Sequence, residues 1–308
     1  MAIGPAFDSA AVARDQAERP AGGRLARGWW GWLVGGVRYV LMTLAALFFI
    51  IPFLWMFLAS FKPQLEIFQY IYPLNWKTFI PQTWTLENYR GLMALNPFPF
   101  THYIANSVFV AVAVTLSSLV VNAMAAYAFA RLDFPGRNVL FALFLSTMII
   151  PFEALAIPLY LEMKTLNWVD TYQALIVPWI ANALGIFLLR QFFLDIPRDL
   201  VDAARIDGCS HLSAFRYVVI PNAIPALITF ALIRFQASWD AFFWPLIVAP
   251  GPEKRVVQVA IATFATEVQT QWGLTFAAST FATLPIILLF LLLQRYYVRG
   301  VVMSGLKG

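Results

Sequence analysis

The stretch YVLMTLAALFFIIPFLWMFLASF, from Tyr39 to Phe61, decides the fold class of this chain. It runs for 23 residues without a charged side chain, which is long enough for a helix to cross a hydrocarbon core of roughly 30 Å. Inside a bilayer no water is present to satisfy backbone N–H and C=O groups, so a single apolar segment must pair them as an α-helix. The sequence therefore predicts a membrane-spanning helix here.

Five further apolar runs predict an all-α polytopic membrane protein with six transmembrane helices. They cover approximately 103–130, 139–160, 173–193, 223–249 and 276–297. Composition agrees, because 61% of the 308 residues are hydrophobic and 12% are charged, against about 25% charged in soluble domains. No internal repeat of fixed period is evident, which argues against a repeat-built transporter.

The basic residues predict the orientation and the domain boundaries. Counted by predicted side, 14 Lys and Arg residues fall on the face that carries both termini and 6 on the other, so both termini are expected in the cytoplasm of a bacterial inner-membrane protein. We expect a cytoplasmic tail and Trp-rich interfacial segment over 1–38, the six-span domain over 39–297 and a cytoplasmic tail over 298–308.

The sequence argues against a disulfide, a metal site, a catalytic site and nucleic-acid binding. One cysteine excludes an internal disulfide. His102 and His211 are predicted on opposite sides of the membrane, so we expect no metal site. Neither H-E-x-x-H nor G-x-S-x-G occurs, and we expect no catalytic residues. The net charge of +5 comes from residues that flank apolar runs, which indicates contact with membrane lipid and not with nucleic acid.

A charged loop over 194–222, between the fourth and fifth predicted spans, carries the most specific pattern. Pro197 suits the first turn of a helix, Asp199 and Asp202 suit its positive end, and Gly208 suits the positive φ that stops it. A second helical stretch is predicted from His211 to Ile220, closed by Pro221.

The side chains of Ala203 and Ala204 are small, so the groove of another protein could approach the backbone of this short helix. The glycine turn would let the two helices form one rigid knob that transmits a partner's motion to the spans. From these residues alone, an ordinary amphipathic helix resting on lipid headgroups explains the pattern equally well.

Resemblance to a known family separates these two explanations. The pattern Asp202-Ala-Ala-x3-Gly208-x9-Val218-x-Ile220-Pro221 resembles the EAA loop of ABC-importer permeases, with Asp in place of the family's Glu. Further segments resemble the sugar-transporting branch and its smaller maltose-type permease. They are Thr85–Tyr89, Asn106-Ser107, Ala125–Arg131, Phe134–Gly136, Phe187–Phe193 and the ending Gln294–Gly308.

The resemblance implies a transport subunit that is not an enzyme. It implies that Asp202, Ala203, Ala204, Asp207, Gly208 and Pro221 couple the spans to an ATP-binding subunit. The expected assembly contains a second permease, two ATP-binding subunits and an extracytoplasmic solute-binding protein. No G-x-x-x-x-G-K-[ST] occurs in this chain, so we expect it to hold no cofactor, with ATP and Mg bound by the partner ATPase subunits.

Three ionisable residues, Glu153, Arg234 and Asp240, fall inside predicted spans. A charge at the centre of a bilayer costs about 3 kcal/mol or more and commonly faces a cavity or a partner. They could border the path of the solute or form structural ion pairs between spans. Arg234 and Asp240 are poorly spaced to pair with each other, so the preferred pair is Arg234 with Glu153.

Trp239 and Trp244 flank Asp240 in the fifth predicted span. Aromatic rings stack on sugar faces, which makes both residues candidates for the solute path, whereas ordinary packing of tryptophan is the alternative. The family often has Trp-Asn-Asp/Glu at this point. This chain has Trp239-Asp240-Ala241, so a polar role cannot be transferred to Ala241.

Two other classes of function fit the sequence less well. A stand-alone secondary transporter or channel would need no rigid cytoplasmic knob and would commonly show repeated spans. A membrane-embedded enzyme would need a catalytic or metal-ligating constellation, which the sequence lacks. The sequence favours the permease of a binding-protein-dependent ABC importer for a sugar or sugar-like solute.

Overall fold

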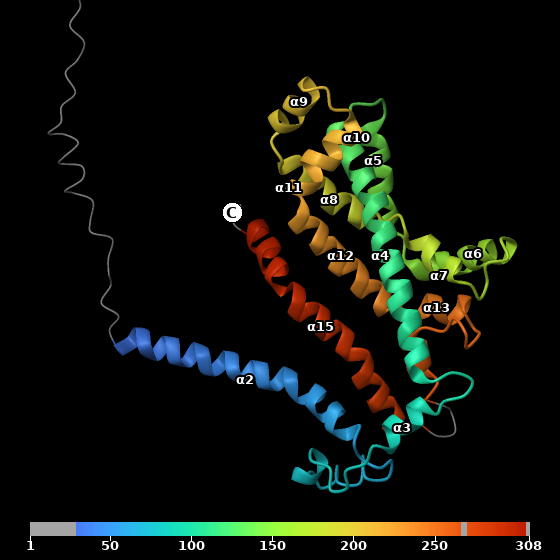
Figure 1. Cartoon of the computed structure of the whole chain (residues 1–308). Coiled ribbons are helices and arrows are strands. Elements are labelled where there is room, and N and C mark those ends of the chain that lie inside the picture. The colour runs from blue at the N-terminus through green and yellow to red at the C-terminus, as the bar shows by residue number, and fades with distance from the viewer. Residues whose placement is uncertain (1–28, 266–269, 306–308) are drawn as a thin grey trace, which may run out of the picture. The chain divides into compact units, whose positions relative to one another are not determined.

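The computed structural model describes residues 29–265 and 270–305, and every regular element in these ranges is a helix (Figure 1). The chain divides into two compact units, residues 1–55 and 56–308, which are considered separately. The prediction of an all-α protein is confirmed.

The helices and their bounds follow in chain order. They are α2 (Trp29–Ala59), η1 (Trp76–Thr78), α3 (Glu87–Met93), α4 (Phe100–Arg131), α5 (Arg137–Ser146), η2 (Thr147–Ile149), α6 (Phe152–Thr165), α7 (Tyr172–Ile176), η3 (Val177–Trp179), α8 (Ala183–Asp195), α9 (Arg198–Ile206), α10 (His211–Ala214), the π-helix η4 (Phe215–Val219), α11 (Ile220–Asn222), α12 (Ile224–Trp239), α13 (Phe243–Val248), α14 (Val257–Ala262) and α15 (Trp272–Gly305).

The first unit contains most of α2, whose segment Val34–Ala59 is long and apolar enough to span a membrane. The helix begins at Trp29, ahead of the predicted start at Tyr39. Of the predicted tail over 1–38, residues 1–28 lie outside the described part of the chain. At the other end α15 continues to Gly305, so residues 298–305 extend the last helix instead of forming a separate tail.

Three helices in the described ranges are candidates for crossing a membrane on their own: α2, α4 and α15. Three further candidates are bent pairs, and counting each pair as one span gives up to six. The run 139–160 is therefore not one straight helix, because its two halves meet at 102°. Pro151 lies at this bend, and a proline disfavours the helical conformation of the residue before it, here Ile150.

The fifth predicted span, 223–249, is also interrupted. Its main helix α12 ends at Trp239, and the short α13 follows after a break. At its start, α12 meets the preceding helical segment at 82°. Ala223 lies at this junction, between Pro221 and Pro225, and proline lacks the N–H that would continue the hydrogen-bond ladder.

In the second unit α4 lies at the centre and packs along both α8 and α12. The three helices approach one another closely at Gly185, where an added Cβ would lie 2.4 Å from the Phe230 ring and 3.3 Å from Asn122. These three residues belong to α8, α12 and α4, so a hydrogen atom in place of a side chain is what lets the three helices meet.

The connection over 62–86 is held by hydrogen bonds of two charged side chains. The ammonium of Lys62 is buried and donates to the carbonyls of Lys77 and Thr78, each at 2.9 Å. The carboxylate of Glu66 accepts from the backbone N–H groups of Gln82 and Thr83. Burial lowers the pKa of Lys62, an effect that the charge of Glu66 partly offsets.

Replacing Gly185 tests the contact between the three helices. We expect Gly185→Ala to destabilise the protein by about 1–3 kcal/mol, because Phe230 is buried and its ring must move. The matched control is Gly36→Ala, where an added Cβ meets nothing within 4 Å. Size-exclusion profiles after heating in detergent measure both changes, and equal midpoints for the two variants would contradict the prediction.

Candidate functional site

The short helix α9 ends in a glycine-based stop. Gly208 has φ +87°, the N–H of Cys209 donates to the carbonyl of Ala204 at 2.9 Å and the N–H of Gly208 donates to the carbonyl of Arg205 at 3.1 Å. These two bonds form a Schellman motif, in which the last carbonyls of a helix are satisfied by residues beyond its end. The turn predicted at Gly208 is present. Pro197 is the N-cap of α9 and lies just before its first turn.

The two sides of α9 have different surroundings. Val201 is buried in a cluster with Leu189 and Phe193 of α8, and Ala204 is half-buried against the same cluster. With 3.6 residues per turn, Ala203 and Ile206 lie on the opposite side, where Ile206 is 86% exposed. The helix is therefore attached to the bundle through one face, and its other face is exposed.

The residues expected to couple the spans to a partner differ in placement. Asp202, Ala203, Asp207, Gly208 and Pro221 are exposed. Ala204 belongs to the attached side of α9, so the two alanines do not share one open surface as the sequence analysis supposed.

The second helical stretch runs past its predicted end. Ser210 caps its start by accepting from the N–H of Ser213 at 3.1 Å, and α10, η4 and α11 continue to Asn222. Pro221 therefore lies inside the last turn instead of closing the helix. Pro221 has no N–H and therefore donates no backbone hydrogen bond to the preceding turn. Just before it, the Ile220 N–H donates to the Phe215 carbonyl five residues earlier, which is the pattern of a π-helical turn.

Two arginines join α4 and α8 at the end of the bundle that carries α9. Arg131 of α4 donates to the carbonyls of Phe193 and Ile196 at the end of α8. In return, the Nε of Arg190 on α8 donates to the carbonyl of Phe129 near the end of α4 at 3.3 Å. Each helix thus caps carbonyls that the other leaves unpaired. Neither arginine is predicted as a functional residue by the sequence patterns above, although arginines that close apolar runs were the available signal.

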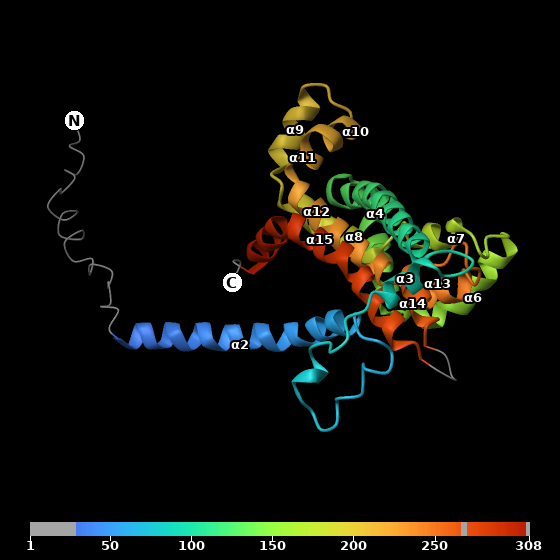
Figure 2. The same cartoon turned by 60° about the horizontal axis from the view of Figure 1, so that its bottom comes forward.

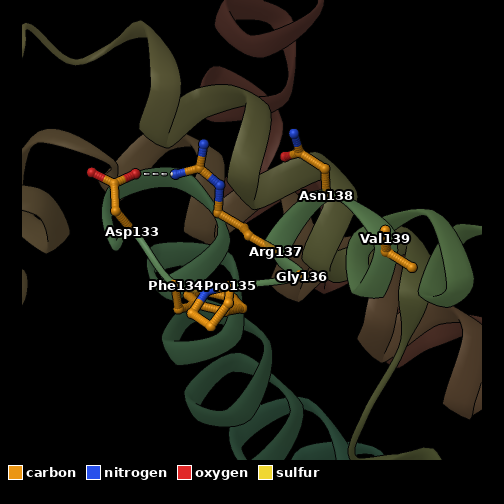
Figure 3. Close-up of a pocket in the computed structure, with 7 residues that line it drawn as sticks. All are labelled: Asp133, Phe134, Pro135, Gly136, Arg137, Asn138 and Val139. Carbon is orange, nitrogen blue, oxygen red and sulfur yellow. Dashed lines mark hydrogen bonds and ion pairs between the residues drawn. The ribbon is translucent and has the colours of Figure 1, made fainter.

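The turn between α4 and α5 lies beside this junction and is held differently (Figure 3). Arg137 points toward Asp133, with Nη1 of Arg137 2.8 Å from Oδ1 of Asp133, and also donates to the Leu132 carbonyl. The side chain of Asp133 is 91% exposed, so the ion pair contributes at most about 1 kcal/mol. The hollow over this turn is lined by residues 133–139 alone and is open to the surroundings.

A second polar site occupies the break between η3 and α8. Asn122 of α4 donates to the Ile180 carbonyl and accepts from the Asn182 N–H, each at 2.9 Å. Arg234 of α12 donates through Nη2 to the Trp179 carbonyl at 2.7 Å. Side chains on two different helices therefore satisfy the backbone groups that the break releases.

The expected ion pair between Arg234 and Glu153 does not form. Within residues 29–265 and 270–305, no carboxylate lies within 4.0 Å of the guanidinium of Arg234. Glu153 is exposed in the first turn of α6, beyond the 102° bend that the sequence analysis did not foresee. The neighbouring Phe152 packs on Trp179 with ring centroids 4.9 Å apart, so α6 begins near Arg234, but the side chain of Glu153 is exposed and forms no pair with it.

The remaining candidates for the solute path divide between two places. Trp244 lines a cavity of about 150 Å³ together with Arg234. Trp239 is buried in a hydrophobic cluster with Phe100 and Val257, where its indole N–H donates to the Ala282 carbonyl at 3.2 Å. Asp240 caps the end of α12 and is exposed. Of the five predicted residues, Arg234 and Trp244 line one cavity together.

Comparison with known sequences identifies the family. Residues 118–303 match the family described as "Binding-protein-dependent transport system inner membrane component". The chain belongs to this family. The match includes α9, its glycine stop and the break at residues 179–182, so the EAA-type loop recognised in the sequence is part of a permease.

Curated relatives match over most of this permease. The arabinooligosaccharides transport system permease protein AraQ of Halalkalibacterium halodurans is 35% identical, covering 84% of this chain and 91% of AraQ. The trehalose/maltose transport system permease protein MalG of Thermococcus litoralis is 33% identical over 87% of this chain and 94% of MalG. The trehalose transport system permease protein SugB of Mycobacterium tuberculosis is 34% identical over 87% and 96%.

Solved structures agree on the fold. A chain of a bacterial ABC transporter involved in the import of the acidic polysaccharide alginate superposes with a TM-score of 0.75 at 24% identity, covering 90% of the permease and 99% of that chain. A chain of a bacterial alginate ABC transporter in complex with alginate pentasaccharide-bound periplasmic protein gives a TM-score of 0.59 at 13% identity, covering 86% and 95%.

Removing Arg131 should loosen the attachment of α9. In Arg131→Met the Phe193 and Ile196 carbonyls lose a charged donor, which is worth about 1.5–3 kcal/mol per bond. We expect amide hydrogen exchange over residues 196–206 to accelerate by about tenfold or more. The control is Arg137→Met, which removes the exposed pair with Asp133. Equal exchange in the two variants would show that Arg131 does not hold this junction.

Proposed function

We propose that this permease is one of two membrane-spanning subunits of an ABC importer and that the exposed face of α9 docks on an ATP-binding subunit. The complete assembly then contains a second permease, two ATP-binding subunits and an extracytoplasmic solute-binding protein. Both termini and α9 lie in the cytoplasm, as the distribution of basic residues predicts.

The observation that carries this proposal is the two-sided structure of α9. Its inner side packs on the bundle through Val201, whereas Ile206 on its outer side is exposed. Leu212 of the adjoining α10 is also 65% exposed. An apolar side chain left exposed on a helix outside the spans favours burial against another protein. In both views α9, α10 and α11 form one projection at an end of the second unit (Figures 1 and 2).

Movement of the partner reaches the spans through this projection. Val201, Ala214 and Val219 pack into the same cluster as Tyr127 of α4 and Phe230 of α12. A well-packed cluster of this kind resists compression and carries a displacement as a unit. A push on α9 therefore displaces the ends of α4, α8 and α12 together, which is the change that alternating access requires.

The proposed solute is a sugar or a sugar-like molecule. The relatives AraQ, MalG and SugB, at 33–35% identity, are named for arabinooligosaccharides, trehalose and maltose. The chain contains no phosphate-binding glycine loop of the G-x-x-x-x-G-K-[ST] type. ATP hydrolysis, with its Mg, is accordingly assigned to the partner subunits, and this subunit is non-catalytic.

Two substitutions at Gly208 test the docking. The residue has φ +87° and an added Cβ meets nothing within 4 Å, so substitution acts through backbone strain and not through a clash. We expect Gly208→Val, which is β-branched, to release the ATP-binding subunit. Gly208→Asn should retain it, because asparagine tolerates positive φ.

The measurement is a mild-detergent pull-down from native membranes through a C-terminal tag, followed by mass spectrometry. Wild type and Gly208→Asn should recover an ATP-binding subunit and a second permease, and Gly208→Val should recover the second permease alone. If wild type purifies alone from membranes in which another importer remains intact, the proposal is wrong and a stand-alone transporter or channel becomes the better explanation.

A further inference from the structure

The cavity of about 150 Å³ lies among α4, α7, α12 and α13 and is enclosed on most sides. Its wall includes Trp179, Arg234, Ser238, Ala241 and Trp244. By liquid volume the space would hold about five water molecules, at roughly 30 Å³ each. It therefore accommodates a small charged group with a few neighbouring atoms, but not an oligosaccharide.

Arg234 gives this cavity an uncompensated positive charge. The residue is only 8% exposed, and of its donors Nη2 binds the Trp179 carbonyl while Nε is buried without a hydrogen-bond partner. No carboxylate of the described residues lies within salt-bridge distance. A carbonyl neutralises no charge, and an unpaired cation at membrane depth costs several kcal/mol.

The rest of the wall supplies surfaces for contact but no anion. The indole N–H of Trp244 is already used by the Ala174 carbonyl at 2.9 Å, so its ring contributes an apolar face. The guanidinium of Arg234 lies 5.9 Å from the centre of the Trp179 ring. A cation, two aromatic rings and a free volume are the elements with which proteins bind a small anionic ligand.

We infer that this cavity binds the acidic group of an anionic sugar-like solute, a carboxylate, sulfonate or phosphate, with Arg234 as its counter-ion. This inference rests on the proposed function and specifies its solute class. It adds a site within this subunit, so the permease contacts the solute directly during passage. A neutral sugar would leave the charge of Arg234 unpaired and is disfavoured by the same cost.

Ala241 offers a way to probe the cavity without knowing the solute. It lies on the same wall as Arg234 and carries only a methyl group. Cys209 is the single cysteine of the chain, so Cys209→Ser gives a background in which Ala241→Cys is the sole thiol of this subunit, and labelling is read from the mass of this subunit alone. The assembled importer in nanodiscs is treated with two thiol reagents of similar size, anionic sulfonatoethyl methanethiosulfonate and cationic trimethylammonioethyl methanethiosulfonate.

With each rate divided by that of the same reagent with a small free thiol in solution, the anionic reagent should react at least about tenfold faster than the cationic one, because the field of Arg234 attracts it. Arg234→Gln should abolish the preference, whereas Arg234→Lys should retain it. Glutamine can still donate to the Trp179 carbonyl, so a loss confined to the charge preference separates attraction of anions from support of the backbone. Glucuronate, galacturonate or glucose 6-phosphate at millimolar concentration should slow the anionic reagent, and glucose and galactose should not.

Three results would overturn the inference: equal rates for the two reagents after division by their free-thiol rates, no reaction with either, or no protection by any acidic sugar. The first would mean that a carboxylate of the second permease, or another group of the assembly, already neutralises Arg234. Failure of the proposed function is recognised separately, since ATP-binding subunits would then be missing from the purified sample before any thiol reaction begins.

Discussion

Backbone groups released by a break in a transmembrane helix must find partners within the protein, and this requirement organises the permease. Between η3 and α8 the carbonyls of Trp179 and Ile180 are satisfied by Arg234 from α12 and Asn122 from α4. Lipid offers no substitute for these donors. The break therefore persists only where α4 and α12 hold it from two sides, and this fixes the positions of all three helices.

The same three helices carry the projection that contains α9. Gly185, three residues after Asn182, allows α8 to approach Phe230 closely, and the contact continues into the cluster that buries Val201. Toward its other end α8 is joined to α4 by the reciprocal bonds of Arg131 and Arg190. Under the proposed function, a displacement of α9 is transmitted along α8 to the break, because Val201 packs in one cluster with Leu189 and Phe193 of α8.

Features that depend on neighbouring residues alone could be predicted from the sequence. Apolar runs predicted the helices, and Gly208 predicted the stop of α9 because few other residues accept its φ of +87°. The bend at Pro151 was not predicted, because proline also occurs inside transmembrane helices, as Pro52 and Pro285 do here. The expected partner of Arg234 was wrong for a related reason: the sequence shows that a buried arginine needs an acceptor, but a backbone carbonyl at a helix break satisfies that need without any signal in the side chains.

Arg234 combines two tasks that are normally assigned to different residues. As a donor to Trp179 it stabilises the break, and as an unpaired cation it gives the adjacent cavity its charge. One guanidinium can do both, since it has five N–H donors and a single carbonyl occupies only part of them. Any displacement of α8 that moves Trp179 must then move or release Arg234. If the two proposals hold, the charge that attracts an acidic solute and the contact that responds to α9 are on the same side chain, and a change at either one alters the other directly.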